Sequence, residues 1–511
     1  GAVVEVENPS NRTIVATVPK ATASDLATAL AAAERVRGEW RDTGAWQRSE
    51  VLRRAASLIR ERVDEIAGLL TEEQGKTLAE ARGEVHSAAE QFDWYADEAR
   101  RIYGRTLSGP SQGVRTEVRK EPIGPVAAFT PWNFPVMLAA RKLAPALAAG
   151  CPIILKPAEE APSACLAMVR AVHDAGVPAG VIAAVTGDPA FVSATLMGSP
   201  VIRKVSLTGS VRVGQLVMQL ASQHMASVSF ELGGHAPVII CDDVDVATVA
   251  ALCVKTKYRN SGQVCIAPTR FLVARSILDE FEAEFTRATA ALTLGSGTEA
   301  GVDVGPMCSA RRHDDFASLL DDAIAHGAVV TTGGASRGEE LGGHFYAPTV
   351  LRDIPIEARI LQEEPFGPVA LLMAYDDLEE AVTLANNTPY GLAGYLFTND
   401  VTRAQLLSDE LAFQRSVAAS SAAAALPQGA IHADLFRDNV VFDVADGHDR
   451  LSGLFDFFFA GIDTLLFDVA VCLNDWCIDP PSGRLLEDRA AAFCDAYQRV
   501  RPFSGSELRL M

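Results

Sequence analysis

A cysteine in a glycine-containing turn is the residue of this 511-residue chain best suited to nucleophilic chemistry. Cys265 ends the run Ser261-Gly262-Gln263-Val264-Cys265, where the small glycine lets a ligand approach closely. Most lone cysteines are buried and inert, so this feature alone favours a structural thiol. A carboxylate shifts that balance, because Glu231 opens the run Glu231-Leu232-Gly233-Gly234 at the end of an expected strand, residues 226–230. There it can act as general base for a thiol or a water molecule.

An asparagine between two prolines supplies a second polar group. Asn133 lies in the run Thr130-Pro131-Trp132-Asn133-Phe134-Pro135, whose prolines restrict the backbone. A rigid side-chain amide can stabilise the oxyanion that develops on a carbonyl under attack. The alternative, that Asn133 only completes the hydrogen bonds of a turn, fits the residues equally well.

Two further polar segments are compatible with a nucleotide. Lys156-Pro157-Ala158-Glu159 ends an expected strand, where lysine and glutamate can bond ribose hydroxyls. Leu207-Thr208-Gly209-Ser210, followed by Gly214, lies at a strand-to-helix turn, where backbone amides can face a pyrophosphate. A Gly-x-Gly-x-x-Gly fingerprint is absent, and each segment alone is more often structural than functional.

Alternating strands and helices must position these residues. Helices are expected over most of residues 23–103, including 45–70 and 78–103, because apolar residues recur there at intervals of three and four residues. Strands are expected at 124–129, 153–156, 181–185, 204–207 and 226–230, with helices at 136–149, 163–175, 190–196 and 211–221 between them. This order predicts a doubly wound parallel sheet with ligands beyond the carboxyl ends of its strands. A second α/β stretch covers about 231–400.

Composition excludes several classes of protein. The formal net charge of −20 argues against binding to nucleic acid. No apolar run approaches the roughly 20 residues of a membrane span. The nine cysteines show no Cys-x-x-Cys pair and the first residues show no signal sequence, so a cytoplasmic enzyme with free thiols is expected.

Taken together, these motifs resemble the aldehyde dehydrogenase superfamily over about residues 3–405. The resemblance also rests on Glu363-Glu364-Pro365-Phe366-Gly367-Pro368 and Asn386-Asn387-Thr388-Pro389-Tyr390-Gly391-Leu392. It implies an α/β fold of doubly wound parallel sheets, with a cofactor domain at 1–230 and a catalytic thiol domain at 231–405. It also implies that Cys265 attacks an aldehyde to form a thiohemiacetal and then a thioester. Asn133 and the amide of Cys265 would hold the oxyanion, and Glu231 would activate the hydrolytic water.

The resemblance also implies a cofactor site and no metal in the dehydrogenase part. The residues that it assigns to the cofactor are Thr130, Trp132, Lys156, Glu159, Gly209, Ser210, Gly214, Glu364 and Phe366. A carboxylate at position 159 would accept hydrogen bonds from a free 2′-hydroxyl and repel a 2′-phosphate. NAD is therefore expected in preference to NADP, which stays open as an alternative.

Within the superfamily, the chain looks most like the succinate-semialdehyde dehydrogenase branch. In that branch, arginines at the positions of Arg141 and Arg259 bind the distal carboxylate of the substrate, and a guanidinium fork suits a carboxylate well. Glutarate and 2-oxoglutarate semialdehydes carry the same group and stay open, as does a purely structural role for both arginines. Some members have a second cysteine two residues after the nucleophile; here Ala267 stands there, so that redox switch is not expected.

The resemblance stops near residue 405. Residues 407–501 instead resemble the C-terminal half of a homoserine kinase of the aminoglycoside-phosphotransferase-like group, an α+β lobe placed at 406–511. The run His432-Ala433-Asp434 and Asn439 have the spacing of a phosphotransferase catalytic loop. Asp434 would be the base, and Asn439 and Asp456 would hold magnesium.

No ATP-binding lobe precedes this fragment, so homoserine phosphorylation is the weaker alternative. A chimera that binds NAD without turnover is another alternative. The family forms homo-oligomers, but the strand that completes them is not recognisable here, so an oligomer is doubtful.

Overall fold

Five parallel strands form the sheet at whose edge the first candidate residues lie. The computed structural model gives the order β7-β6-β5-β8-β9. The strands are β5 (Val126–Phe129), β6 (Ile153–Lys156), β7 (Ile182–Ala184), β8 (Lys204–Thr208) and β9 (Ser227–Glu231). The connecting helices are α5 (Pro135–Ala148), α6 (Ser163–Asp174), α7 (Pro189–Met197) and α8 (Val211–Ser222). The expected doubly wound sheet is confirmed.

Helices cover both faces of this sheet because its central strands are apolar on both sides. Val126 and Ala128 belong to one buried cluster with residues of α2 (Ala45–Glu61), α4 (Leu78–Ala99), α5 and α6. Ala127 and Phe129 belong to another with residues of α1 (Ala23–Asp42), α7 and α8. Alternate residues of a strand point to opposite faces, so one short apolar run fills two cores.

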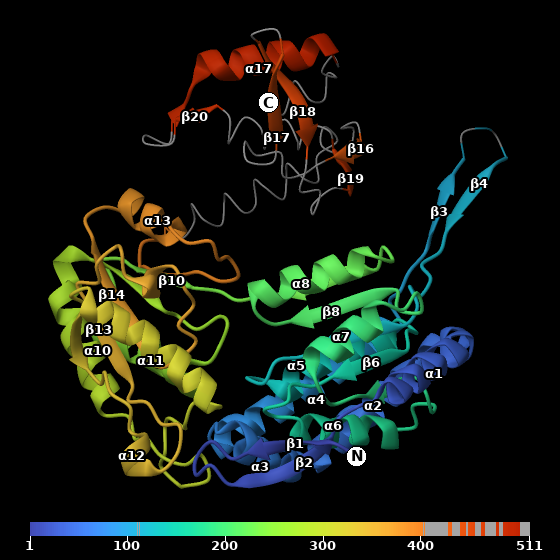
Figure 1. The fold of residues 1–511 in the computed structure, drawn as a ribbon, viewed down its shortest axis with the longest axis horizontal. Helices are drawn as coiled ribbons and strands as arrows, with labels where there is room; N and C mark the ends of the chain where they lie inside the picture. The colour runs from blue at the N-terminus through green and yellow to red at the C-terminus, as the bar shows by residue number, and fades with distance from the viewer. Residues whose placement is uncertain are drawn as a thin grey trace. The chain divides into compact units, whose positions relative to one another are not determined.

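The N-terminal layer consists of α1 (Ala23–Asp42), α2 (Ala45–Glu61), α3 (Val63–Gln74) and α4 (Leu78–Ala99). Thr22 and Thr77 begin α1 and α4 with capping boxes. The single helix expected over 45–70 is wrong, because the chain leaves helical geometry at Arg62. Two unanticipated hairpins are β1 (Val3–Glu7) with β2 (Ile14–Pro19) and β3 (Arg105–Ser108) with β4 (Arg115–Val118). Figure 1 shows the second as an arm that extends away from the helices.

The second sheet has the order β12-β13-β14-β11-β10-β15, with only β12 antiparallel to its neighbour. Its strands are β10 (Pro237–Ile240), β11 (Arg270–Ala274), β12 (Val329–Thr332), β13 (Thr349–Arg352), β14 (Val369–Tyr375) and β15 (Tyr395–Phe397). Its helices are α9 (Val246–Tyr258), α10 (Leu278–Ala290), α11 (Ala310–Ala325), the short α12 (Gly338–Leu341) and α13 (Leu378–Asn386). An aromatic cluster of Phe271, Phe281 and Phe285 lies at its core.

The chain divides into two compact units, Gly1–Asn399 and Asp400–Met511. The structure describes all residues except 110, 112, 402, 404–427, 432–439, 446–447, 455–460, 465–476, 480–483 and 501–511. The second unit has β16 (Gln428–Ile431) paired with β19 (Gly461–Thr464), β17 (Val440–Ala445) with β18 (His448–Leu454), β20 (Ile478–Asp479) with β21 (Arg484–Leu485), and helix α17 (Glu487–Val500). Among the described residues, no helix is both long and apolar enough to span a membrane.

Candidate active site

Four strands of the first sheet deliver polar residues to one edge. Lys156 ends β6 beside Phe129 of β5, and Thr130 follows Phe129 directly. On the other side of β5, Thr208 at the end of β8 pairs with Glu231 at the end of β9. Because these strands are parallel, all these side chains lie at the carboxyl edge where such sheets bind ligands.

The β6 end of this edge carries a charged pair and an unsatisfied hydroxyl. Lys156 Nζ lies 2.7 Å from Glu159 Oε1 and donates to the carbonyl of Pro157 at 3.1 Å. Thr130 is buried, and its hydroxyl has no hydrogen-bond partner among the described residues. Buried polar groups are normally paired, so this hydroxyl is ready for a ligand.

Helix α8 begins at the same edge. Ser210 caps it by accepting from the amide of Val213, and the first turn contains no acidic residue. The free amides of such a turn favour an anion. Gly209 donates its amide to Glu231 O at 3.0 Å. A Cβ on Gly214 would lie 2.8 Å from Leu232 Cδ2, so this glycine allows α8 to pack closely on the segment after β9.

The loop before Cys265 has an unusual backbone. Asn260, Ser261 and Gly262 have positive φ angles of 50°, 56° and 71°, which disfavour ordinary side chains. A Cβ on Gly262 would overlap the carbonyl oxygen of Gly367, so glycine is required where the two loops touch. Ser261 donates its hydroxyl to Gly305 O at 2.7 Å. These contacts place Cys265 beside the segment that carries Glu364 and Phe366.

Asn133 reaches the cysteine loop across 130 residues of sequence. Its Nδ2 donates to Gln263 O at 3.0 Å, two residues before Cys265. Nδ2 has two hydrogens, so one remains for a further acceptor. Asn260 Nδ2 donates to the carbonyl of Asn133 at 2.9 Å, which joins the two loops a second time.

The Cys265 thiol is partly buried and lies in an acidic environment. Burial raises its pKa above the usual value, and the charges of Glu364 and Glu231 raise it further. The main-chain amides of Cys265 and Ile266 act in the opposite direction. A Cβ on Gly234 would lie 2.7 Å from Cys265 O, so the segment after Glu231 is packed against the cysteine. At neutral pH the resting thiol is protonated and needs a base to become a nucleophile.

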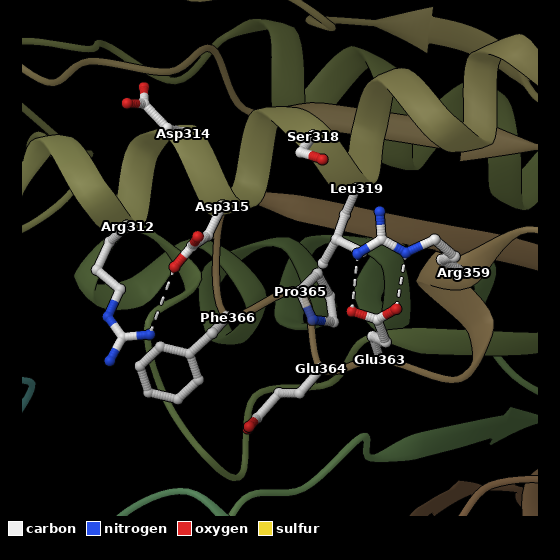
Figure 2. A pocket seen from close by; sticks show the side chains of 10 residues that line it. All are labelled: Arg312, Asp314, Asp315, Ser318, Leu319, Arg359, Glu363, Glu364, Pro365 and Phe366. Carbon is white, nitrogen blue, oxygen red and sulfur yellow. Dashed lines mark hydrogen bonds and ion pairs between the residues drawn. The ribbon is translucent and has the colours of Figure 1, made fainter.

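Glu364 lies between α11 and the segment Gly233-Gly234 that follows Glu231. Gly234 donates its amide to Glu364 Oε1 at 3.1 Å, and burial raises the pKa of this carboxyl to about 7. Figure 2 shows Glu364 and Phe366 in a pocket with Arg312 of α11, while Glu363 is paired with Arg359. Phe366 meets Trp132 edge to face at 5.5 Å between ring centroids. The residues expected at the nicotinamide end therefore lie close to Cys265.

Of the two arginines expected to bind the substrate, Arg259 lies against the turn that carries Asn133. The guanidinium carbon of Arg259 is 5.3 Å from the centroid of the Phe134 ring. Arg141 lies seven residues after Phe134, about two helical turns along α5. Both arginines are exposed, so their side chains are open to an anionic ligand.

Sequence reasoning missed several residues around the site. Lys142 is buried, contacts Ser206 Oγ at 3.1 Å and has its pKa lowered to about 8 by burial, an effect that the charge of Glu231 opposes. The sequence feature that could have indicated Lys142 is a lysine on the apolar face of an alanine-rich helix. Tyr395 donates to Ile266 O at 2.6 Å, next to the nucleophile. His235 lies 2.8 Å from Ile360 O through Nε2.

The kinase-like residues Asp434, Asn439 and Asp456 lie outside the described residues. The model of the phosphotransferase enzyme family matches residues 374–503. This match supports a phosphotransferase-like C-terminal part and does not specify a homoserine kinase.

Comparison with known proteins extends over most of the chain. The model of the aldehyde dehydrogenase family matches residues 1–424. A putative 4-(hydroxymethyl)benzenesulfonate dehydrogenase of Comamonas testosteroni is 45% identical over 80% of this chain and 84% of its own length. An Escherichia coli succinate-semialdehyde dehydrogenase [NADP(+)] is 39% identical over 81% of this chain and 85% of its own. The crystal structure of succinate-semialdehyde dehydrogenase from Burkholderia pseudomallei matches with a TM-score of 0.78 at 41% identity, covering 80% of this chain and 84% of that one.

Proposed function

Because the chain belongs to the aldehyde dehydrogenase family, we propose that it oxidises an aldehyde with a distal anionic group to the corresponding acid. Succinate semialdehyde is the first candidate, with the related carboxylated semialdehydes next. The observation that carries the proposal is the convergence of Asn133, Glu231 and Cys265, which come from three different segments of the chain.

Each of these residues has a separate task. The Cys265 sulfur attacks the aldehyde carbonyl, and the thiol proton leaves to a base. The remaining N–H of Asn133 Nδ2 and the amide of Cys265 hold the oxyanion of the thiohemiacetal. Glu231, exposed at the end of β9, removes the proton from the water that hydrolyses the thioester.

The carboxyl edge of the first sheet suits a dinucleotide. The Thr130 hydroxyl, which has no hydrogen-bond partner in the part of the chain that the structure describes, fits a phosphate, as does the first turn of α8, which has no acidic residue. Lys156 and Glu159 fit the adenosine ribose. The path of the dinucleotide is shaped by Gly209, Gly214 and Trp132. Its nicotinamide end fits beside Glu364 and Phe366. When bound, the nicotinamide supplies the hydride acceptor of the oxidation. NAD is proposed as the preferred form because the Glu159 carboxylate opposes a 2′-phosphate, although the Escherichia coli relative is named for NADP.

Arg141 and Arg259 are proposed to bind the anionic end of the substrate. Both are exposed, and Arg259 lies against Phe134 in the turn that carries Asn133. The names of the relatives include both a carboxylated semialdehyde and an aromatic sulfonate. A guanidinium can pair with either anion.

The first test is NADH formation from succinate semialdehyde and NAD by the purified chain. Cys265→Ala should abolish turnover, whereas the matched variant Cys165→Ala, which changes a fully buried core thiol, should retain it. Turnover that survives Cys265→Ala would refute the proposal. Folded wild type that is stabilised by NAD but forms no NADH would instead support the alternative of a chain that binds cofactor without catalysis.

A further inference from the structure

We infer that the buried ion pair between Lys76 and Glu84 is a positioning device for Asn133, which holds the oxyanion-binding turn in register with the Cys265 loop. The inference deepens the proposed function and rests on it. Neither residue belongs to the sites described above, and neither touches the thiol in the described contacts.

The pair is unusual because two charges lie in the protein interior. The side chains of Lys76 and Glu84 are 0% and 1% exposed, and Lys76 Nζ contacts Glu84 Oε2 directly. Lys76 Nζ also donates to Asn133 O at 2.8 Å and lies 4.0 Å from the centroid of the Phe134 ring. Taking two charges out of water has a large free-energy cost, so such a pair stabilises a fold poorly and requires accurate geometry. A role in fixing geometry agrees with that cost.

The second oxygen of Glu84 holds the helix that follows Asn133. Glu84 Oε1 accepts from the amides of Val136 and Met137 at 2.9 and 3.1 Å. These amides belong to the first turn of α5, where the N-cap residue Phe134 provides no side-chain hydrogen bond. Glu84 therefore supplies from α4 the cap that the local sequence lacks.

The same helix also holds the loop of the nucleophile. Glu80, one turn before Glu84, accepts from the amide of Asn260 at 2.8 Å. Asn260 in turn donates to Asn133 O, so this carbonyl receives N–H groups from both Lys76 and Asn260. The start of α4 thus holds the asparagine turn and the cysteine loop at once.

A displacement of Asn133 would affect oxyanion formation more than the thiol itself. The side-chain amide can stabilise an oxyanion only within hydrogen-bond distance, and a misplacement of about 1 Å can cost roughly 100-fold in rate. Alkylation of a thiol develops no oxyanion, whereas acylation does. The ratio of these two rates at Cys265 therefore reports on the position of Asn133.

The test compares Glu84→Gln with Glu73→Gln in the cofactor-free chain at pH 8. Glu73 is also about 1% exposed and also caps a helix, accepting from Ser163 and Ala164 at 2.8 Å each, but has no described contact with Lys76 or Asn133. Acylation of Cys265 by p-nitrophenyl acetate should fall about 10- to 100-fold in Glu84→Gln, with alkylation by iodoacetamide unchanged. Both rates should stay at the wild-type level in Glu73→Gln.

Lys76→Met provides a second variant, which keeps Glu84 as the cap of α5, if Glu84→Gln does not fold. An unchanged acylation rate, or equal losses of acylation and alkylation, would overturn the inference. NADH formation by wild type is measured in parallel: wild type that is acylated but forms no NADH would contradict the proposed function alone. Wild type that is not acylated at Cys265 would contradict both.

Discussion

The side-chain amide of Asn133 donates to the main-chain oxygen of Gln263 at 3.0 Å, so the asparagine is anchored two residues from Cys265. One N–H of the amide is used for this anchor, and the other is left to stabilise an oxyanion. The position of the donor is therefore set before substrate arrives, which is the condition for efficient electrostatic catalysis.

Asn133→Ala should lower kcat about 100- to 1,000-fold with little change in KM, because the lost hydrogen bond forms mainly in the transition state. Steady-state NADH formation measures both constants. An increase in KM at constant kcat would show that Asn133 contributes to substrate binding instead.

Glu231→Gln should separate the two halves of the reaction. The amide side chain of this variant cannot remove the proton from water, so hydrolysis of the thioester on Cys265 becomes slow. Rapid mixing should show a burst of about one NADH per site followed by a slow steady state. A progress curve without a burst, with NADH formation already slow in the first turnover, would place Glu231 in the activation of the thiol.

Glu159→Gln should weaken the preference for NAD over NADP. The variant keeps a hydrogen-bonding group beside Lys156 and removes the charge that repels a 2′-phosphate. The ratio of kcat/KM for NAD to that for NADP should fall about tenfold, equivalent to ~1.4 kcal/mol. Glu160→Gln is the matched control, since the neighbouring Glu160 contacts Arg311. A ratio unaffected by Glu159→Gln would assign cofactor choice to other residues.

Arg141→Gln and Arg259→Gln should each raise KM for succinate semialdehyde about tenfold or more, because a charge-assisted hydrogen bond to the carboxylate is lost. Butanal, which lacks the carboxylate, should be oxidised at the wild-type rate. Equal effects on the two aldehydes would mean that the arginines serve the structure. Arg287→Gln, which changes an exposed arginine on α10, is the control.

His235 should make stability depend on pH. Burial lowers its pKa from 6.5 to about 4, and Nε2 contacts Ile360 O. As pH falls, the ring of the unfolded chain takes up a proton near pH 6.5, whereas the buried ring of the folded chain does so only near pH 4. The folded chain therefore loses about 3 kcal/mol of stability between pH 6.5 and 4. His235→Gln keeps a donor for Ile360 and cannot titrate. The unfolding free energy of wild type should therefore fall relative to that of the variant as the pH is lowered from 7 to 4. Parallel curves of unfolding free energy against pH would show that His235 does not titrate on unfolding.

The sequence predicted the carboxyl edge of the first sheet well and the contacts between distant loops poorly. Lys156 follows an apolar run and Glu231 follows a segment in which apolar residues alternate with serine. Parallel pairing brings such strand ends together whatever the details of packing. By contrast, Lys76 meets Asn133 through tertiary packing, with no local pattern to indicate it. The break at Arg62 was missed because helical periodicity continues through it, and no proline or glycine marks it.

The contact between Gly262 and Gly367 limits how this site can be changed. With no side-chain layer between the two backbones, neither loop can shift without displacing the other. The loop of Cys265 and the segment of Glu364 can therefore move only together. Engineering that enlarges the space around Cys265 has to work through side chains such as Phe134, because moving either backbone would alter reactivity and cofactor affinity together.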